Sequence, residues 1–363
     1  MSPARIAAQR MLNQRIAGEK CAQPAEVVKW MGALQAQDYH QALWAVGVRM
    51  QSPTVDAVTQ AIMDRKIVLT WPLRGTIHFA PAEDVKWMLE LSATRRLAGN
   101  KRRTQQLELD EETLERCQVI FYGALQGGKQ LSRPDMMQLL EQNGISAKGQ
   151  RGYHILWTLA QQGLLCMGPR QAKQQTFVLL DEWVPHSREL SREASLVELA
   201  RRYFASHGPA TLQDFARWAG ITLTDAKAGV HEAGSDLMAE TVNGETCWQG
   251  AGSIDAESLD MSGGVLLPGF DEYLIGYGNR SDVLPDEYAS QVVPGSNGIF
   301  LPVVVVDGQV VGTWKRVFRK KGVIITLNPF TKGNITEEKI TAAAQSYSHF
   351  MGLPLVQINI DDE

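Results

Sequence analysis

The sequence predicts an α+β fold in which three tandem winged-helix units are followed by a C-terminal β-rich, small barrel-like domain. Two observations support this prediction. Three times along the 363 residues, amphipathic helical stretches lead into a longer helical stretch, a short strand, a turn and another strand. From Gly263 onward the pattern changes to strands. We place the four units at residues 1–105, 106–190, 191–260 and 261–363.

The first unit has the most elaborate pattern. We expect helices at residues 3–16, 24–34 and 54–64, and strands at residues 67–71 and 76–79. Arg74 and Gly75 lie between the two strands and predict the turn of a hairpin.

The middle unit shows the order most clearly. The pair Gly127 and Gly128 ends its first helix, because glycine tolerates a left-handed cap. Ser132 supplies a capping hydroxyl for a second helix, and the third helix would be the recognition helix. We expect the outer helices at residues 111–126 and 153–162, strands at residues 164–167 and 176–180, and a polar, basic wing loop at residues 168–175.

The third unit repeats that order. Thr211 and Asp214 have the spacing of a capping box, with Asp in place of the usual Glu or Gln. Asn243 and Gly244 predict a type I′ turn, since both accept positive φ angles. We expect the other two helices at residues 195–206 and 224–233 and the hairpin at residues 237–248.

The C-terminal domain is expected to contain a meander. Asp307-Gly308 and Lys321-Gly322 are the turn signals between its strands. We expect strands at residues 265–268, 300–306, 309–318, 323–327 and 355–360, and one helix at residues 336–351.

Composition limits the class of protein. No apolar run approaches the about 20 residues of a membrane-spanning helix, and the N-terminus lacks the apolar core of a signal peptide. We therefore expect a cytoplasmic protein that does not contact membranes. Cys21, Cys117, Cys166 and Cys247 are scattered without a Cys-x-x-Cys pair, and the histidines are dispersed. We expect no metal and no other cofactor.

Basic residues are clustered although the formal net charge is −4. A negative net charge argues against a nonspecific polyanion binder, because that affinity needs clustered positive charge that displaces counterions. Basic clusters alone are more often solvated faces, but beside three winged helices we interpret them as DNA contacts. The DNA-binding candidates are Arg74, Thr76, His78, Arg95, Arg96, Lys101, Arg102, Arg103, Arg170, Lys173, Lys315 and Arg316.

An unusual polar cluster covers residues 32–41. Gln35 and Gln37 point to the same side only if the chain is extended, so a shared role requires that the preceding helix has ended by Gln35. Without further information, such glutamines more often cap a helix end or bind backbone groups. Asp38 competes for the role of activating water, but it would face away from both glutamines.

This cluster resembles the Gln-x-Gln motif of the AlkZ-like DNA glycosylases. The resemblance covers nearly the whole chain, in segments that include residues 70–78, 267–277, 297–300 and 311–316. It implies three winged-helix units around a concave DNA-binding face, hydrolysis of the N-glycosidic bond of bulky or crosslinking N7-alkylated purines, and Gln35 and Gln37 as the catalytic pair. A related branch has Asp in place of the second Gln, so the narrower match is to the crosslink-resistance branch.

The chemistry is consistent with two uncharged side chains. Ordinary glycoside hydrolysis uses two carboxylates, but an N7-alkylated guanine is already cationic and leaves as a neutral base without an acid. A fixed amide can then position the water. We expect neutral bases such as uracil to stay intact, and a monomeric, nucleoid-associated enzyme whose partner is double-stranded DNA carrying alkylated or crosslinked purines.

Two other functions remain open. A noncatalytic winged-helix transcription regulator is the main alternative, because winged helices are common in regulators and fold does not establish function. A metal-dependent nuclease is less favoured, since no carboxylate cluster has metal-ligand spacing. The sequence does not decide whether Asp271, Glu272, Tyr273 and Arg280 line the lesion face or join the last domain to the rest.

Overall fold

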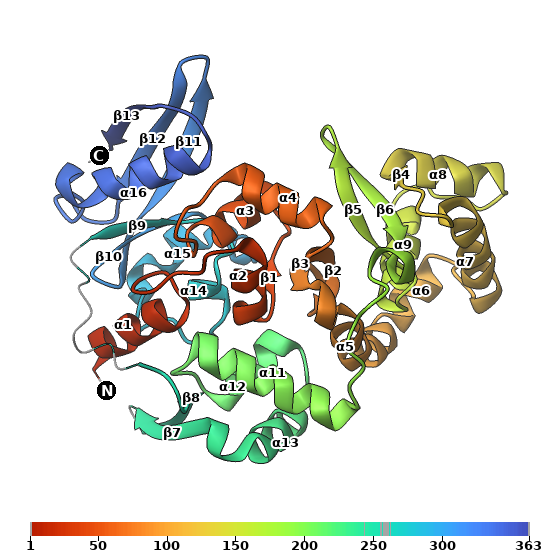
Figure 1. The fold of residues 1–363 in the computed structure, drawn as a ribbon, viewed down its shortest axis with the longest axis horizontal. Coiled ribbons are helices and arrows are strands. Elements are labelled where there is room, and N and C mark those ends of the chain that lie inside the picture. The colour runs from red at the N-terminus through yellow and green to blue at the C-terminus, as the bar shows by residue number, and fades with distance from the viewer. Residues whose placement is uncertain (1, 243, 255, 257–260, 262, 362–363) are drawn as a thin grey trace.

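Among its described residues, the N-terminal section contains six α-helices and one hairpin. The fold is that of a computed structural model, which describes residues 2–242, 244–254, 256, 261 and 263–361. The elements of this section are α1 (Pro3–Asn13), α2 (Pro24–Met31), β1 (Leu34–Gln35), α3 (Tyr39–Gly47), α4 (Val55–Met63), β2 (Ile67–Leu73), β3 (Thr76–Pro81), α5 (Val85–Gly99) and α6 (Lys101–Gln106) (Figure 1). The sequence did not predict β1 or α3, and α2 ends three residues earlier than expected.

The next two sections follow the expected order of three helices and a hairpin. Their elements are α7 (Glu111–Leu125), β4 (Leu131–Ser132), α8 (Arg133–Gln142), α9 (Arg151–Gln161), β5 (Leu165–Gln171), β6 (Gln174–Leu179) and α10 (Leu180–Trp183), then α11 (Arg192–His207), α12 (Leu212–Ala219), α13 (Leu223–Ala233), β7 (Leu237–Val242) and β8 (Glu245–Gly250). The capping box of α12 forms as predicted: the Thr211 hydroxyl accepts a hydrogen bond from the Asp214 backbone, and the Asp214 carboxylate accepts one from the Thr211 backbone.

The expected wing loop at residues 168–175 is largely strand. β5 and β6 continue to a tight turn at Ala172 and Lys173, where Ala172 has a φ of +52°. The loop prediction was wrong because it was made from polar composition, whereas pairing across the hairpin supplies the backbone partners that a loop would lack. The turn predicted between β7 and β8 includes Asn243, which lies outside the described residues.

Strands from the first two sections form one sheet. Its order is β1-β3-β2-β5-β6-β4, and Leu69 of β2 pairs with Met167 of β5 at the junction. This sheet crosses the boundary expected between residues 105 and 106. The first two sections therefore do not form separate sheets.

The C-terminal section contains an open sheet with one long helix against it. Its elements are β9 (Gly264–Leu267), α14 (Glu272–Ile275), α15 (Ala289–Val292), β10 (Val303–Val306), β11 (Gln309–Arg319), β12 (Gly322–Pro329), α16 (Glu337–Phe350) and β13 (Leu355–Ile360). Strands β9 to β12 form the predicted antiparallel meander, and β13 adds in parallel to β12 after α16. The strand order β13-β12-β11-β10-β9 leaves β9 and β13 as edges, so the sheet does not close into the expected barrel.

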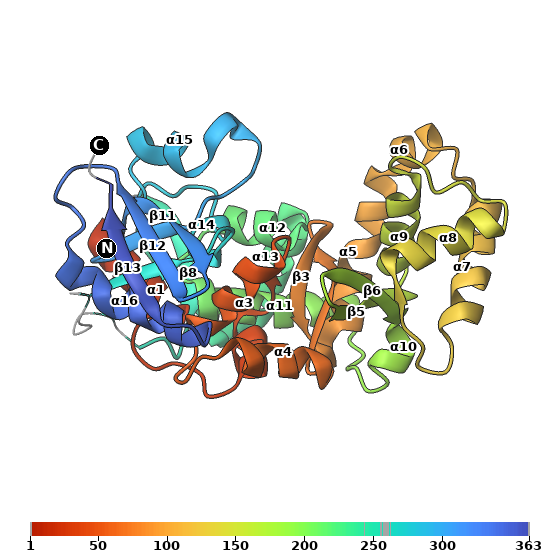
Figure 2. The same cartoon turned by 90° about the horizontal axis from the view of Figure 1, so that it is seen from above.

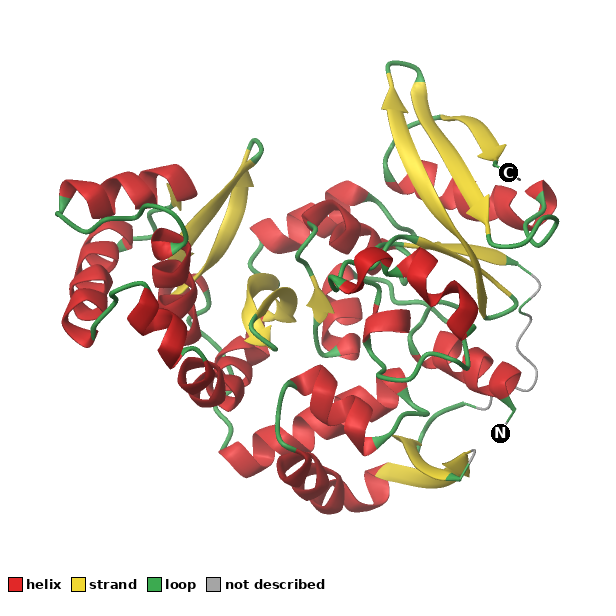
Figure 3. Ribbon diagram, turned by 180° about the vertical axis from the view of Figure 1, so that it is seen from behind, coloured by secondary structure: helices red, strands yellow, loops and turns green. Residues whose placement is uncertain are grey.

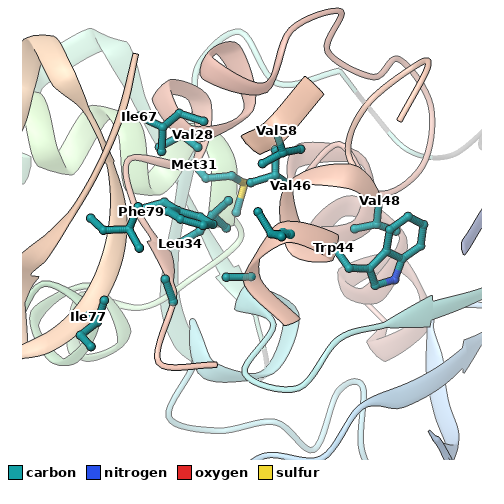
Figure 4. Packing of buried hydrophobic residues seen from close by; sticks show 14 of the residues in the cluster. Val28, Met31, Leu34, Trp44, Val46, Val48, Val58, Ile67, Ile77 and Phe79 are labelled. Atoms are coloured by element: carbon teal, nitrogen blue, oxygen red, sulfur yellow. The ribbon is translucent and has the colours of Figure 1, made fainter. Parts of the chain in front are cut away.

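Strand β2 is buried along its whole length because two hydrophobic cores meet on it. Ile67, Leu69 and Trp71 belong to a core shared by the first, second and C-terminal sections. Val68 and Leu73 belong to a core shared with α5 and the third section. In the first core, Leu34 of β1 lies beside Phe79 of β3, next to Met31 and Val28 of α2 (Figure 4).

A buried ion pair joins the first and C-terminal sections. Arg49 donates two hydrogen bonds to Asp271, of 2.8 and 2.9 Å, and neither side chain is exposed to solvent. The Trp44 indole nitrogen also donates to the Leu266 carbonyl, at 2.7 Å. Asp271 is therefore part of the link between sections, which answers one question that the sequence left open.

Two hairpins rise on opposite sides of α3 and α4. One is β5–β6 and the other is β11–β12, and both project from the same side of the molecule (Figures 1 and 3). Seen from above, α3 lies between the C-terminal sheet and the second section (Figure 2). Within the described ranges, no helix has the length and apolar character to cross a membrane, and no group of His, Cys, Asp and Glu side chains is arranged to hold a metal ion.

Candidate active site

Gln35 and Gln37 lie between two helices, Gln35 at the end of strand β1 and Gln37 at a bend of the chain. Helix α2 ends at Met31, and Gly32 turns the chain with a φ of +76°. A side chain is disfavoured there both by that φ and because a Cβ atom would lie 3.3 Å from the Trp218 ring. Gln35 then pairs with His78 of β3, and the Ala36 amide donates to the Ile77 carbonyl at 2.7 Å. The preceding helix has thus ended by Gln35, but the extended chain expected for a shared role is present at Gln35 and gives way to a bend at Gln37.

The Gln35 side chain is half-buried and held by Arg74. The Arg74 Nη2 donates to Gln35 Oε1 at 3.2 Å, and Nη1 donates to the Trp218 carbonyl at 2.7 Å. Arg74 has a φ of +51° and Gly75 one of +73°, so they form the turn between β2 and β3. Left-handed backbone at a residue with a Cβ costs roughly 1–2 kcal/mol. Asparagine or glycine would adopt this positive φ more easily than arginine does.

Beneath Gln35 lies the carboxylate of Glu272, which is 1 % exposed. Its Oε1 accepts from the Gln35 backbone amide at 3.4 Å, and its Oε2 accepts from the Trp218 indole at 2.9 Å. The His207 Nε2 is 3.5 Å from Oε2, and the His207 ring is stacked on Tyr203. Burial alone would raise the pKa of Glu272, but the neighbouring His207 and Arg74 lower it below its usual value. Glu272 is therefore a buried anion at neutral pH.

His78 is fully buried and neutral. Its Nδ1 is 2.8 Å from the Thr76 carbonyl, so this nitrogen carries the proton and donates. Its Nε2, 3.3 Å from Arg74 Nη2, is then the acceptor. Burial and the charge of Arg74 lower the pKa of His78 to about 3. His78 was expected to contact DNA, and in this structure its side chain has no exposed surface.

Gln37 differs from Gln35 because it is exposed. Its amide makes no hydrogen bond to the part of the chain that the structure describes. With Tyr39 and Arg170 it lines a cavity of about 40 Å³, in which the Arg170 guanidinium lies 4.4 Å from the Tyr39 ring centre. About 10–15 Å³ of such space holds one water molecule. A cavity of this size can hold a few waters beside Gln37.

The basic candidates lie on several elements. Arg95 and Arg96 are on α5, Lys101, Arg102 and Arg103 on α6, Arg170 and Lys173 on the β5–β6 hairpin, and Lys315 and Arg316 on β11. Most are exposed, whereas Arg96 and Arg316 are half-buried. Arg74 was expected to bind DNA, but its guanidinium is directed to three groups of the protein. Thr76, on the same hairpin, is half-buried, and its hydroxyl has no partner among the described atoms.

The other undecided residues have structural partners. The Asp38 carboxylate accepts from the His40 and Gln41 amides and so caps α3. Arg280 donates to the Leu274 carbonyl at 2.7 Å, and Tyr273 donates to the Gly308 carbonyl at 2.7 Å. Sequence analysis missed His207 and Trp218 as partners of Glu272. No local pattern marks them, since each lies more than 50 residues from Glu272 along the chain.

The sequence profile of the family described as DNA glycosylase AlkZ-like matches residues 28–350. The chain belongs to the AlkZ-like DNA glycosylases. Membership makes it an enzyme that acts on DNA glycosyl bonds, and it favours catalysis over the alternative of a noncatalytic regulator. The family resemblance noted in the sequence is thereby confirmed.

A curated relative and a solved structure agree with this assignment. The interstrand DNA cross-link repair glycosylase of Streptomyces sahachiroi is 25% identical over 351 residues, which cover 90% of this chain and 91% of the relative. The solved structure of Streptomyces sahachiroi DNA glycosylase AlkZ matches with a TM-score of 0.83 at 23% identity, over 99% of this chain and 100% of that chain. This AlkZ-like glycosylase therefore has the AlkZ fold.

We expect this AlkZ-like glycosylase to lose stability as the pH falls from about 6.5 towards 3. In that window His78 takes up a proton in the unfolded chain but not in the folded protein, so acid favours unfolding. Each pH unit should lower the free energy of unfolding by about 1.4 kcal/mol for this one group. Urea unfolding at several pH values measures the slope.

The variant His78→Gln should flatten that slope, since glutamine does not titrate and can still accept from Arg74. His186→Gln, at an exposed position, is the control for the loss of a histidine. An unchanged slope in His78→Gln would show that His78 takes up its proton over the same pH range in the folded protein as in the unfolded chain.

Proposed function

We propose that the protein hydrolyses the N-glycosidic bond of N7-alkylated purines in double-stranded DNA, including bulky and interstrand-crosslinked adducts. Its family and the interstrand cross-link repair activity of its Streptomyces sahachiroi relative support this function. The observation that carries the chemistry is the exposed, unpaired Gln37 amide beside a cavity of water size. Glu272 and His78, which contact Gln35 and Arg74, are both buried, and the Asp38 carboxylate beside Gln37 is engaged as the cap of α3. An uncharged site of this kind suits a substrate that needs no acid.

Gln35 and Gln37 are the proposed catalytic residues. The oxygen of a water molecule forms a bond to C1′ of the deoxyribose while the bond from C1′ to N9 of the base breaks. The electron pair of that bond stays with the base and neutralises its positive charge, and the proton released by the water goes to solvent. A carbonyl oxygen of the amide pair accepts a hydrogen bond from this water and orients it.

The exposed cations, together with the half-buried Arg316, are the proposed DNA contacts. Arg95, Lys101, Arg102 and Arg103 lie on adjoining helices, while Arg170 with Lys173 and Lys315 with Arg316 lie on the two projecting hairpins. We interpret α7–α9 with β5–β6, and α11–α13 with β7–β8, as winged-helix units; the N-terminal section is a more elaborate version. Because its substrate is DNA, we place the enzyme in the cytoplasm, at the nucleoid. One copy of the chain carries all of the proposed DNA contacts, which is consistent with a monomer.

Base release from defined duplexes tests this proposal. Purified protein is incubated with duplexes that contain 7-methylguanine, a crosslink between alkylated purines, or uracil. We expect free alkylated base and an abasic site that hot alkali cleaves, with uracil left in place. Binding to palindromic sites without release of any base, or equal release of uracil, would contradict the proposal.

A further inference from the structure

The carbonyl of the Gln35 amide already has a partner. A guanidinium has only N–H donors, so the end of the Gln35 amide that faces Arg74 must be the oxygen. Oε1 accepts from Arg74 Nη2 at 3.2 Å, and the opposite end of the amide is therefore the NH₂ group. This Nε2 donates to no group of the described chain. Gln35 is half-buried, so its free group is a donor that the protein leaves unused.

Arg74 itself cannot turn away from Gln35 without losing other partners. Nη1 donates to the Trp218 carbonyl at 2.7 Å, and Nη2 is also 3.3 Å from His78 Nε2, which accepts from it. The buried carboxylate of Glu272 balances the charge of Arg74 and accepts from the Gln35 backbone at 3.4 Å. The orientation of the Gln35 amide is thus fixed by the hydrogen bonds of Arg74, His78 and Glu272.

Gln37 has the opposite arrangement. Its amide is exposed and unpaired within the described chain, and it lines the cavity of about 40 Å³ that accommodates water. Both ends of this amide are free. Of the two glutamines, Gln37 is therefore the one whose carbonyl is available to accept from a water molecule.

We propose that the two glutamines have different roles. Gln37 accepts a hydrogen bond from the attacking water, whereas Gln35 donates through Nε2 to an oxygen of the damaged nucleotide. Arg74 and Glu272 are positioning residues, because they act on the substrate only through the Gln35 amide. This inference rests on the proposed glycosylase function.

Alanine and glutamate variants at both positions test the inference. Glutamate keeps an acceptor of the same length but removes the NH₂ donor. We expect Gln37→Glu to excise 7-methylguanine at least about tenfold faster than Gln37→Ala in single-turnover experiments, because the acceptor for water is restored. Gln35→Glu should be no faster than Gln35→Ala, although its carboxylate still accepts from Arg74.

The possible outcomes separate the two proposals. An inactive wild-type enzyme on every alkylated duplex would overturn the glycosylase function together with this inference. An active wild-type enzyme in which glutamate also rescues position 35 by about tenfold would overturn only the division of roles. Thermal unfolding of all four variants shows whether each is folded.

Variants of Arg74 give an independent measurement. Arg74→Lys keeps a charge that only donates, whereas Arg74→Met has a side chain of similar length without a donor. We expect Arg74→Met to lower the single-turnover rate constant at least about tenfold with an unchanged Kd for the duplex, and Arg74→Lys to recover part of the loss. The side-chain NH₂ resonances of Gln35 should broaden or shift in Arg74→Met. Equal rates for the two variants and unchanged resonances would contradict a positioning role.

Discussion

Replacing Gln37 by alanine is expected to lower the single-turnover rate of 7-methylguanine excision by about 10²-fold, because misplacement of a reacting group by about 1 Å can cost that factor. The substitution removes the exposed amide beside the water-sized cavity. Because the side chain makes no hydrogen bond to the described chain, the free energy of unfolding should change by less than about 0.5 kcal/mol. Rapid quenching measures the rate, and fluorescence anisotropy with a noncleavable duplex measures binding.

Asp38→Asn is the matched control for that variant. Asparagine keeps an oxygen that can cap α3 but removes the only carboxylate next to Gln37 in the sequence. We expect excision by Asp38→Asn to stay within about threefold of wild type, because Asp38 is engaged with the His40 and Gln41 amides. Loss of excision in Asp38→Asn together with full activity in Gln37→Ala would show that Asp38 activates the water.

Replacing Arg49 by methionine is expected to destabilise the fold by about 3–5 kcal/mol, the usual effect of removing one partner of a buried ion pair. The variant leaves Asp271 as a buried, unpaired carboxylate. It also removes the donors to the Gln14 and Ala45 carbonyls and to the Gln14 side chain. Urea unfolding measures the difference.

An exposed ion pair provides the control for Arg49. Lys339 lies 3.2 Å from Asp307, and both side chains are largely in solvent. Lys339→Met should change the free energy of unfolding by less than about 1 kcal/mol, since such pairs contribute little. If the two variants lost similar amounts of unfolding free energy, burial would not be what makes the Arg49–Asp271 pair strong.

Local signals in the sequence were sufficient for many elements. The capping residues Ser132 and Thr211 each start a helix where expected, and the turn at Asp307-Gly308 lies between β10 and β11. Elements that depend on distant partners were missed. Strand β1 has only two residues, too few for a periodic pattern, and it exists because β3 lies beside it. The pairing of Leu69 with Met167 has no local signal at all.

The candidate site was predicted in part. Gln35 and Gln37 were chosen from the sequence, and the helix before them ends by Gln35 as their shared role requires, but the chain bends at Gln37 instead of staying extended. Arg74 and His78 were chosen as DNA contacts because a hairpin tip usually faces solvent, whereas here Arg74 donates to the Trp218 carbonyl of the third section and His78 is buried beside Arg74. Burial that depends on segments more than a hundred residues away cannot be deduced from local sequence.

The double burial of β2 has a mechanical consequence. A strand with a core on each face cannot serve as a hinge, so we expect the sections that meet on it to keep a fixed spacing when the enzyme docks on its substrate. Any strain needed to bring a lesion to the glutamines would then be borne by the double helix, which bends at a cost of order 1–6 kcal/mol. Lesions that make the duplex easier to bend should therefore bind best to a protein whose sections keep a fixed spacing.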